Sequence, residues 1–213
     1  SLVDHFGPAH GGLITAADVA AYAPVIREPL RVEFGHHTVL TNPPPSAGGG
    51  LVGAGLRIAA GLGLGQEAFR TRAHQLAIAA LLATVSDLRQ SGYDERLRSD
   101  PASIRDLVAG DGIPTWVARA RSRRHENPLG ATTHISVIDA QGMAAAMTTS
   151  NGEGCGEALP GLGIHVNNFL GEDDINPGGF HQLVPGSWMS TMMSPTIVVA
   201  GERPCFALGS GGS

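Results

Sequence analysis

The sequence predicts an α+β fold in which helices pack on an antiparallel sheet. Three observations support this prediction: residues 1–131 carry mainly helical patterns, residues 132–213 carry mainly strand patterns, and the change falls at the Gly-Ala-Thr of 130–132. The chain has 213 residues, of which 42% are hydrophobic and 15% are charged. It can therefore bury a core, and its length suits one large or two small domains.

The first elements are a short helix and a strand. Thr15 and Asp18 have the spacing of a capping box, which predicts a helix that runs from Ala16 to Tyr22. Apolar residues then alternate with polar ones across Arg31–Leu40, and this alternation predicts a strand.

Longer helices are expected in the rest of the first part. Three Pro and three Gly within residues 43–50 predict a rigid extended piece that turns sharply into a helix over Leu51–Ala60. Gln66–Gln90 is the clearest helix, because its apolar residues recur near one face at a spacing of about 3.6 residues. Tyr93–Asn127 is polar and is expected to hold helical stretches and surface loops.

The second part is expected to consist of short strands joined by turns. The first two strands have a period of two and flank an Ala-Gln-Gly turn, so they predict a hairpin, and the last two flank Gly-Glu and predict another. The expected strands are Thr132–Asp139, Met143–Thr149, Gly161–Asn168, Thr196–Ala200 and Pro204–Leu208.

Composition and charge exclude several classes of function. All 14 basic residues are Arg, which rules out a Walker A phosphate loop, a pyridoxal Schiff base and a Lys nucleophile within this chain. The net charge is −5, and the only dense basic run, at 119–124, is too small for a nucleic-acid surface. The longest apolar stretch, near Leu76–Val85, is too short to span a membrane. Cys155 and Cys205 are too few for a disulfide framework.

One segment, Thr132–Val137, reads Thr-Thr-His-Ile-Ser-Val and resembles the start of the small subunit of γ-glutamyltranspeptidases, where those precursors cleave themselves. Other segments match landmarks of the same family in the same order. They are residues 11–15 with Tyr22, residues 43–49, Asn167-Asn168, residues 193–198 and residues 209–213.

The resemblance implies a four-layer αββα sandwich of the N-terminal-nucleophile hydrolase type. Residues 1–131 would be the C-terminal portion of the large subunit, and residues 132–213 would begin the small subunit. Thr132 would become the nucleophile after autocatalytic cleavage between Ala131 and Thr132. The new α-amino group, with a pKa of about 8, would then act as the general base for the hydroxyl of its own residue. Gly211 and Gly212 would form the oxyanion hole with bare backbone N–H groups.

The turn after the second strand of the first hairpin carries two further residues of the family pattern. Thr149 or Ser150 would donate a hydrogen bond to the nucleophile, and Ser150 is taken as the candidate catalytic residue. Asn151 would contact the α-amino group of the substrate. Both residue types are also common in turns, which is the competing structural interpretation.

The carboxylate that would contact the substrate ammonium can be assigned in two ways, according to how the chain is aligned with the family motif. A straight count makes Glu172 the counterpart of the family's Asp, and a two-residue insertion makes it Asp174. Thr191 would hold the α-carboxylate of the substrate, together with an Arg expected upstream of residue 1. Phe169 and Met192 stand where the family has polar groups, which favours a different acyl group.

The resemblance implies hydrolysis or transfer of γ-glutamyl groups, with glutathione as the donor and water, an amino acid or a peptide as the acceptor. No cofactor, metal or nucleic acid is expected. Two alternatives stay open: an acylase of another amide, cephalosporin-type or acting on poly-γ-glutamate, and a non-catalytic, uncleaved homologue. The family is often periplasmic or secreted, but this chain leaves the compartment undetermined.

Overall fold

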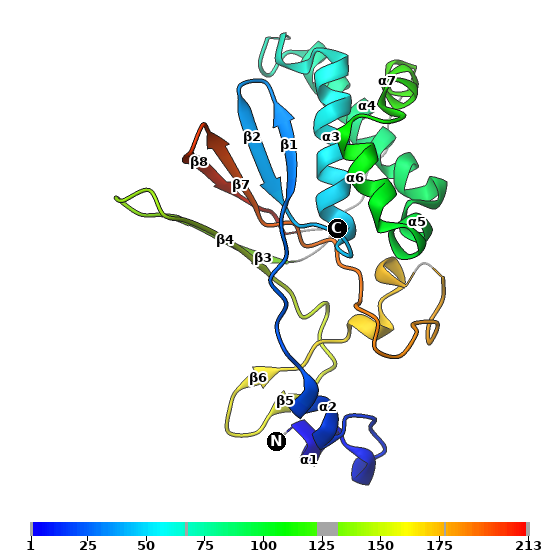
Figure 1. The fold of residues 1–213 in the computed structure, drawn as a ribbon. Helices are drawn as coiled ribbons and strands as arrows, with labels where there is room; N and C mark the ends of the chain where they lie inside the picture. The colour runs from blue at the N-terminus through cyan, green and yellow to red at the C-terminus, as the bar shows by residue number, and fades with distance from the viewer. Residues whose placement is uncertain (1, 67, 123–131, 177, 212–213) are drawn as a thin grey trace.

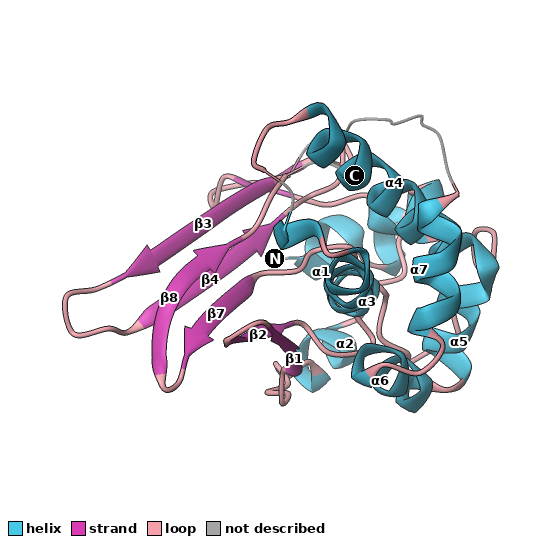
Figure 2. Cartoon of the chain, turned by 90° about the horizontal axis from the view of Figure 1, so that it is seen from above, coloured by secondary structure: helices cyan, strands magenta, loops and turns pink. Residues whose placement is uncertain are grey.

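The computed structural model describes residues 2–66, 68–122, 132–176 and 178–211. In these residues, a layer of helices covers a four-stranded antiparallel sheet, and a long two-stranded hairpin lies alongside the sheet (Figure 1). Figure 2 shows the strands on one side and the helices on the other. The mixed α/β architecture that the sequence predicts is therefore present.

In the described residues, most helices precede β3 and most strands follow α7. The helices are α1 (Leu2–Phe6), α2 (Ala16–Ala21), α3 (Ala47–Leu62), α4 (Arg72–Leu88), α5 (Asp94–Ser99), α6 (Pro101–Ala109) and α7 (Ile113–Arg121). The strands are β1 (Leu30–Phe34), β2 (His37–Thr41), β3 (Thr133–Ile138), β4 (Ala144–Thr149), β5 (Ala158–Leu159), β6 (Ile164–His165), β7 (Thr196–Ala200) and β8 (Arg203–Leu208). Short helical turns are η1 (Pro8–His10), η2 (Leu64–Gln66), η3 (Arg89–Tyr93), η4 (Phe169–Gly171) and η5 (Asp173–Ile175).

Both hairpins predicted in the second part are confirmed. β3 pairs with β4 in an antiparallel register that runs from Thr133–Thr149 to Ile138–Ala144. β7 pairs with β8, and the sheet order β1-β2-β7-β8 joins this hairpin to the first part of the chain. The strand expected over Gly161–Asn168 is wrong except at β6, because Gly161 and Gly163 adopt left-handed φ angles of 76° and 65°.

The single strand expected over Arg31–Leu40 is wrong. The segment is a hairpin whose turn lies at Gly35 and His36, between β1 and β2. Gly35 has a φ of 61°, a left-handed conformation that breaks an extended strand and is open to glycine. The predicted helix at Ala16 is confirmed with its capping box: the Asp18 N–H donates to Thr15 Oγ1, and the Thr15 N–H donates to the Asp18 carboxylate. Hydrogen bonds from Thr15 hold the pKa of Asp18 below its usual range.

Helix α3 begins earlier than predicted and contains the three glycines of residues 48–50. Glycine disfavours helix by about 1 kcal/mol per residue, so local propensity argues against this start. The reason is close packing: a Cβ on Gly48 would stand 2.2 Å from the carbonyl oxygen of Met192, and one on Gly49 would stand 1.9 Å from that of Asn42. Helix α4 is confirmed with shorter bounds than Gln66–Gln90, and the helical stretches expected after residue 93 are α5, α6 and α7.

The main apolar core lies inside the helical layer. It is made of Ala47, Leu51, Ala54, Ile58, Leu88, Tyr93, Leu97, Ile104, Leu107, Ile113 and Ala120. A smaller cluster joins the layer to the sheet; it consists of Leu30, Val32, Val39 and Val108. These two clusters fix α3 against β1 and so hold the N-terminus of α3 in place. Over the described ranges, no helix has the length and hydrophobicity needed to cross a membrane.

Candidate active site

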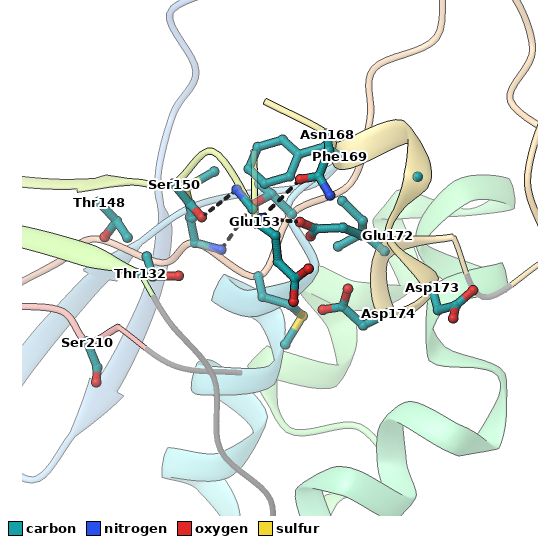
Figure 3. Close-up of a pocket in the computed structure, with 16 residues that line it drawn as sticks. Thr132, Thr148, Ser150, Glu153, Asn168, Phe169, Glu172, Asp173, Asp174 and Ser210 are labelled. Atoms are coloured by element: carbon teal, nitrogen blue, oxygen red, sulfur yellow. Dashed lines mark hydrogen bonds between the residues drawn. The ribbon is translucent and has the colours of Figure 1, made fainter. Parts of the chain in front are cut away.

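A pocket of about 490 Å³ lies where one end of the β3–β4 hairpin meets the loop after β4, the turns η4 and η5, the segment before β7 and the segment after β8. It is lined by Thr132, Thr148, Ser150, Gly152, Glu153, Asn168, Phe169, Gly171, Glu172, Asp173, Asp174, Ile175, Thr191, Met192, Met193 and Ser210 (Figure 3). Of the residues that the sequence singled out, the pocket brings together Thr132, Ser150, Glu172, Asp174 and Thr191.

Thr132 precedes β3 directly and is half-buried at the pocket wall. Its hydroxyl points into the pocket (Figure 3). Gly211 lies against the same residue: a Cβ on Gly211 would stand 1.9 Å from the carbonyl oxygen of Thr132 and 3.1 Å from its nitrogen. The chain can therefore approach Thr132 this closely only because residue 211 lacks a side chain. Gly212 and Ala131 lie outside the described residues.

Strand alternation explains which residues at the end of β4 and directly after it reach the pocket. Thr148 and Ser150 line it, whereas Thr149 between them does not, because successive side chains point to opposite faces of a strand. The Ser150 hydroxyl accepts a hydrogen bond from the Gly152 N–H at 3.1 Å, and its own proton remains available to donate. Thr148 was missed in the sequence, although the period of two could have placed it on the same face as Ser150.

One wall of the pocket is acidic. It carries Glu153, Glu172, Asp173 and Asp174, and no Arg or His stands among the residues that line the pocket in the described chain. Glu172 Oε1 accepts the backbone N–H of Glu153 at 3.1 Å. No sequence pattern pointed to Glu153, because its side chain reaches the pocket only through the turn that follows Ser150. Such a wall favours a positively charged group on the ligand.

Another wall is the segment Thr191–Met193, which is docked on the N-terminus of α3. The Thr191 carbonyl accepts the N–H groups of Ala47 and Gly48 at 3.0 and 3.3 Å and the Ser46 hydroxyl at 3.1 Å. The Thr191 side chain accepts the N–H of Met193 at 3.1 Å, so its hydroxyl proton is available to a ligand. The proline–glycine motif of residues 43–49 therefore shapes the pocket from outside it.

Asn151 does not line the pocket. Its side chain is exposed, and its backbone carbonyl accepts the N–H groups of Gly154 and Asn168 at 2.9 and 3.3 Å. A substrate contact by Asn151 stays a prediction. No group of three or more His, Cys, Asp and Glu residues is arranged to hold a metal ion in the part of the chain that the structure describes.

Thr132 thus combines a hydroxyl in a pocket, a place at the start of a strand and a glycine backbone packed against its own. The chain belongs to the gamma-glutamyltranspeptidase family, whose model matches residues 1–213.

Curated relatives include acylases and glutathione hydrolases. The chain is 30% identical to the Acylase ACY 1 proenzyme of Pseudomonas sp. (strain V22), over 100% of this chain and 40% of that protein. It is 27% identical to the Glutathione hydrolase proenzyme of Bacillus subtilis subsp. natto, over 95% of this chain and 39% of that protein. The chain thus spans about two-fifths of the length of these relatives.

A solved structure shares the fold. The structure described as LmbA2991T421A matches with a TM-score of 0.61 and 22% identity, over 95% of this chain and 39% of that chain. At this identity the match concerns the fold alone.

Proposed function

We propose that the protein transfers or hydrolyses γ-glutamyl groups through an acyl-enzyme on Thr132, with glutathione as a donor. The observation that carries the proposal is the Thr132 hydroxyl, which points into an acidic pocket beside Ser150 while Gly211 lies against the Thr132 backbone. We also propose that the complete fold is the four-layer αββα sandwich, with residues 1–131 from the large subunit and 132–213 from the small one.

The proposed first step is self-cleavage. The Thr132 hydroxyl attacks the carbonyl carbon of Ala131, the peptide C–N bond breaks, and the nitrogen becomes the α-amino group of Thr132. Water then hydrolyses the resulting ester and restores the hydroxyl. The free α-amino group, with a pKa of about 8, stands next to its own Oγ1 and can act as a base near neutral pH.

The proposed second step is acyl transfer. The α-amino group takes the proton from Thr132 Oγ1 as the oxygen attacks the γ-carbonyl carbon of the donor. Backbone N–H groups of Gly211 and Gly212 stabilise the oxyanion, and Ser150 donates a hydrogen bond to the nucleophile. The amide C–N bond breaks as the amine leaves with that proton. Water or an acceptor amine then attacks the ester and releases the acyl group from Thr132.

Substrate binding follows from the two walls of the pocket. A carboxylate of the acidic wall, Asp174 or Glu172, would bind the α-ammonium group of the donor, and Asn151 would add a contact to the same group. Thr191 would donate its hydroxyl to the α-carboxylate. The wall has the charge that an ammonium requires, which supports a donor that carries an amino group.

A second candidate is an acylase that acts on a different amide. Phe169 and Met192 line the pocket where polar contacts to a glutamyl group are expected, and two relatives at 30% identity are named as acylases. Such an enzyme would use the same nucleophile and the same oxyanion hole with a more apolar acyl group.

The test compares γ-glutamyl anilide with glutaryl anilide, which has the same chain length but lacks the amino group. The complete gene product is assayed with both, and the acylated peptide is identified by mass spectrometry. The proposal predicts γ-glutamyl transfer to Thr132 and a preference for γ-glutamyl anilide of at least about tenfold, the scale of one charge-assisted hydrogen bond. A preference for the glutaryl compound favours the acylase candidate, and no acyl group on Thr132 contradicts both.

A further inference from the structure

We infer that Glu172 and Asn168 are positioning residues that hold the loop of residues 150–154 in place, and that Asp174 is left to bind the donor ammonium. The part of this inference that concerns the ammonium rests on the proposed function. The part that concerns the loop stands on the hydrogen bonds of the described residues.

The loop is held by two side-chain oxygens that accept its backbone N–H groups. Asn168 Oδ1 accepts the N–H groups of Glu153 and Gly154 at 3.0 and 3.1 Å. Glu172 Oε1 accepts the same Glu153 N–H at 3.1 Å (Figure 3). A carboxylate oxygen that accepts a backbone N–H is held in one orientation, so part of the Glu172 side chain is already committed to the protein.

Glycine in the loop makes this contact possible. A Cβ on Gly152 would stand 1.6 Å from Glu172 Oε1 and 2.4 Å from Asn168 Oδ1, and Gly152 has a left-handed φ of 62°. Gly154, with a φ of 78°, packs in the same way against the ring of His165, where a Cβ would stand 1.9 Å from Cε1. The loop and the side chains that hold it therefore fit together only while these positions are glycine.

The two turns on either side of Glu172, η4 and η5, are themselves held by hydrogen bonds. The buried side chain of Asn176 donates from Nδ2 to the carbonyl oxygens of Phe169 and Glu172 at 3.0 and 2.7 Å, and so closes the turns η4 and η5. The held loop continues to Ser150, whose hydroxyl accepts the Gly152 N–H. Three hydrogen bonds, joined by short stretches of covalent chain, thus connect buried Asn176 to Ser150, the residue that would contact the nucleophile.

Asp174 differs from Glu172 in this respect. Its carboxylate lines the pocket, and within the described residues it has no hydrogen bond and no ion pair. Only its backbone carbonyl is engaged, by the guanidinium of Arg89. An unengaged carboxylate can give its full hydrogen-bonding capacity to an ammonium, whereas Glu172 would have to share. The sequence leaves open which of the two carboxylates binds the ammonium. The hydrogen bonds therefore assign the loop to Glu172 and leave the ammonium to Asp174.

The experiment uses the complete gene product with Glu172→Ala, Glu172→Gln and Asp174→Asn, and with Glu202→Ala in an exposed turn as the control. It measures kcat and KM for γ-glutamyl anilide. Glu172→Ala is expected to lower kcat about tenfold or more with little change in KM. Glu172→Gln keeps the acceptor oxygen, so its kcat is expected to lie close to that of the wild-type protein. Asp174→Asn is expected to raise KM about tenfold or more. A KM raised by Glu172→Gln, with KM unchanged in Asp174→Asn, overturns the inference.

Amide hydrogen exchange of residues 150–155 gives a readout that needs no turnover. Asn168→Ala is expected to speed exchange at Glu153 and Gly154, whose N–H groups it accepts. Glu172→Ala is expected to speed exchange at Glu153, whose N–H it shares with Asn168, while Glu172→Gln leaves this exchange slow. If exchange follows this pattern in an enzyme that turns over no γ-glutamyl donor, the proposed function fails and the positioning role stands. If the wild-type protein turns over the donor and Glu172→Ala leaves exchange unchanged, the proposed function stands and the positioning role is wrong.

Discussion

The helical layer and the pocket are built by different means. Side chains of the layer bury each other in one apolar cluster that reaches from Ala47 to Ala120. The loops at 150–154 and 167–176 contain one buried residue, Asn176, and are held by hydrogen bonds to backbone groups. Burial of apolar side chains stabilises the fold but is non-directional, whereas a hydrogen bond fixes the orientation of the two groups that it joins. Substitutions in the layer should therefore change stability, and those in the pocket loops should change chemistry.

The largest expected effect is on the stability of the layer. Ile104 is fully buried in the apolar cluster, so Ile104→Ala should lower the free energy of unfolding by about 2–5 kcal/mol. Leu82→Ala is the control, because 54% of that side chain is exposed. Denaturant titration measures both, and kcat of the folded Ile104 variant should match that of the wild-type protein. A kcat that falls together with stability would break the separation between layer and pocket.

The next effect concerns chemistry rather than stability. Gly211→Ala puts a Cβ where the Thr132 carbonyl oxygen lies, so it should displace one of these groups and lower kcat roughly 100-fold, as loss of an oxyanion donor does. Gly65→Ala is the matched control, because among the described residues no atom beyond its two chain neighbours lies within 4 Å of its Cβ position. Steady-state kinetics and thermal melting should show a kcat loss for residue 211 with little change in melting temperature. Equal activity in the two variants would contradict the placement of Gly211.

A third effect lies within the layer and depends on pH. Buried Tyr93 donates to the Ala47 carbonyl at 2.8 Å, and burial raises the pKa of its phenol. The unfolded chain releases this proton above about pH 10 while the folded chain keeps it, so stability should fall as the pH rises beyond that point. Tyr93→Phe should cost about 1–3 kcal/mol at neutral pH and should weaken the alkaline loss. Chemical denaturation at pH 7 and pH 11 measures the free energy of unfolding of both proteins. If the variant loses as much stability between these pH values as the wild-type protein does, groups other than Tyr93 cause the loss.

The smallest effect is expected where the two regions meet. Ser46 precedes α3, and its hydroxyl donates to the carbonyls of Thr191 and Met193 at 3.1 and 3.2 Å. Ser46→Ala should cost about 1 kcal/mol in stability and raise KM a few-fold, because it loosens the wall that carries Thr191. Ser46→Thr keeps the hydroxyl and should behave more like the wild-type protein. Calorimetry measures the effect on stability, and steady-state kinetics measures the effect on KM. A loss of stability without any change in KM would show that Ser46 stabilises the helical layer but does not position the Thr191 wall.

Local patterns predicted much of the fold. The period of two over Thr132–Thr149 found the β3–β4 hairpin, and the spacing of Thr15 and Asp18 found a helix start with its capping box. The glycine-rich start of α3 could not be predicted, because it depends on contacts with Asn42 and with Met192, a residue far away in the sequence. Propensity is local, and those contacts are tertiary.

The site was predicted in part for the same reason. Family motifs brought Thr132, Ser150 and Thr191 to attention, and the fold brings all three to one pocket. Glu153 was missed, since its place in the pocket depends on the turn that follows Ser150. The role of Glu172 could not be separated from that of Asp174, because only the fold reveals which of the two carboxylates accepts a backbone N–H.

The most direct test of the account is the state of the chain at residue 132. Intact mass and N-terminal sequencing are measured on the complete gene product and on its Thr132→Ala variant. The account predicts a fragment that begins at Thr132 in the wild-type protein and a single uncleaved chain in the variant. An uncleaved chain in both proteins, or cleavage at the same bond in the variant, would contradict Thr132 as the self-processing nucleophile.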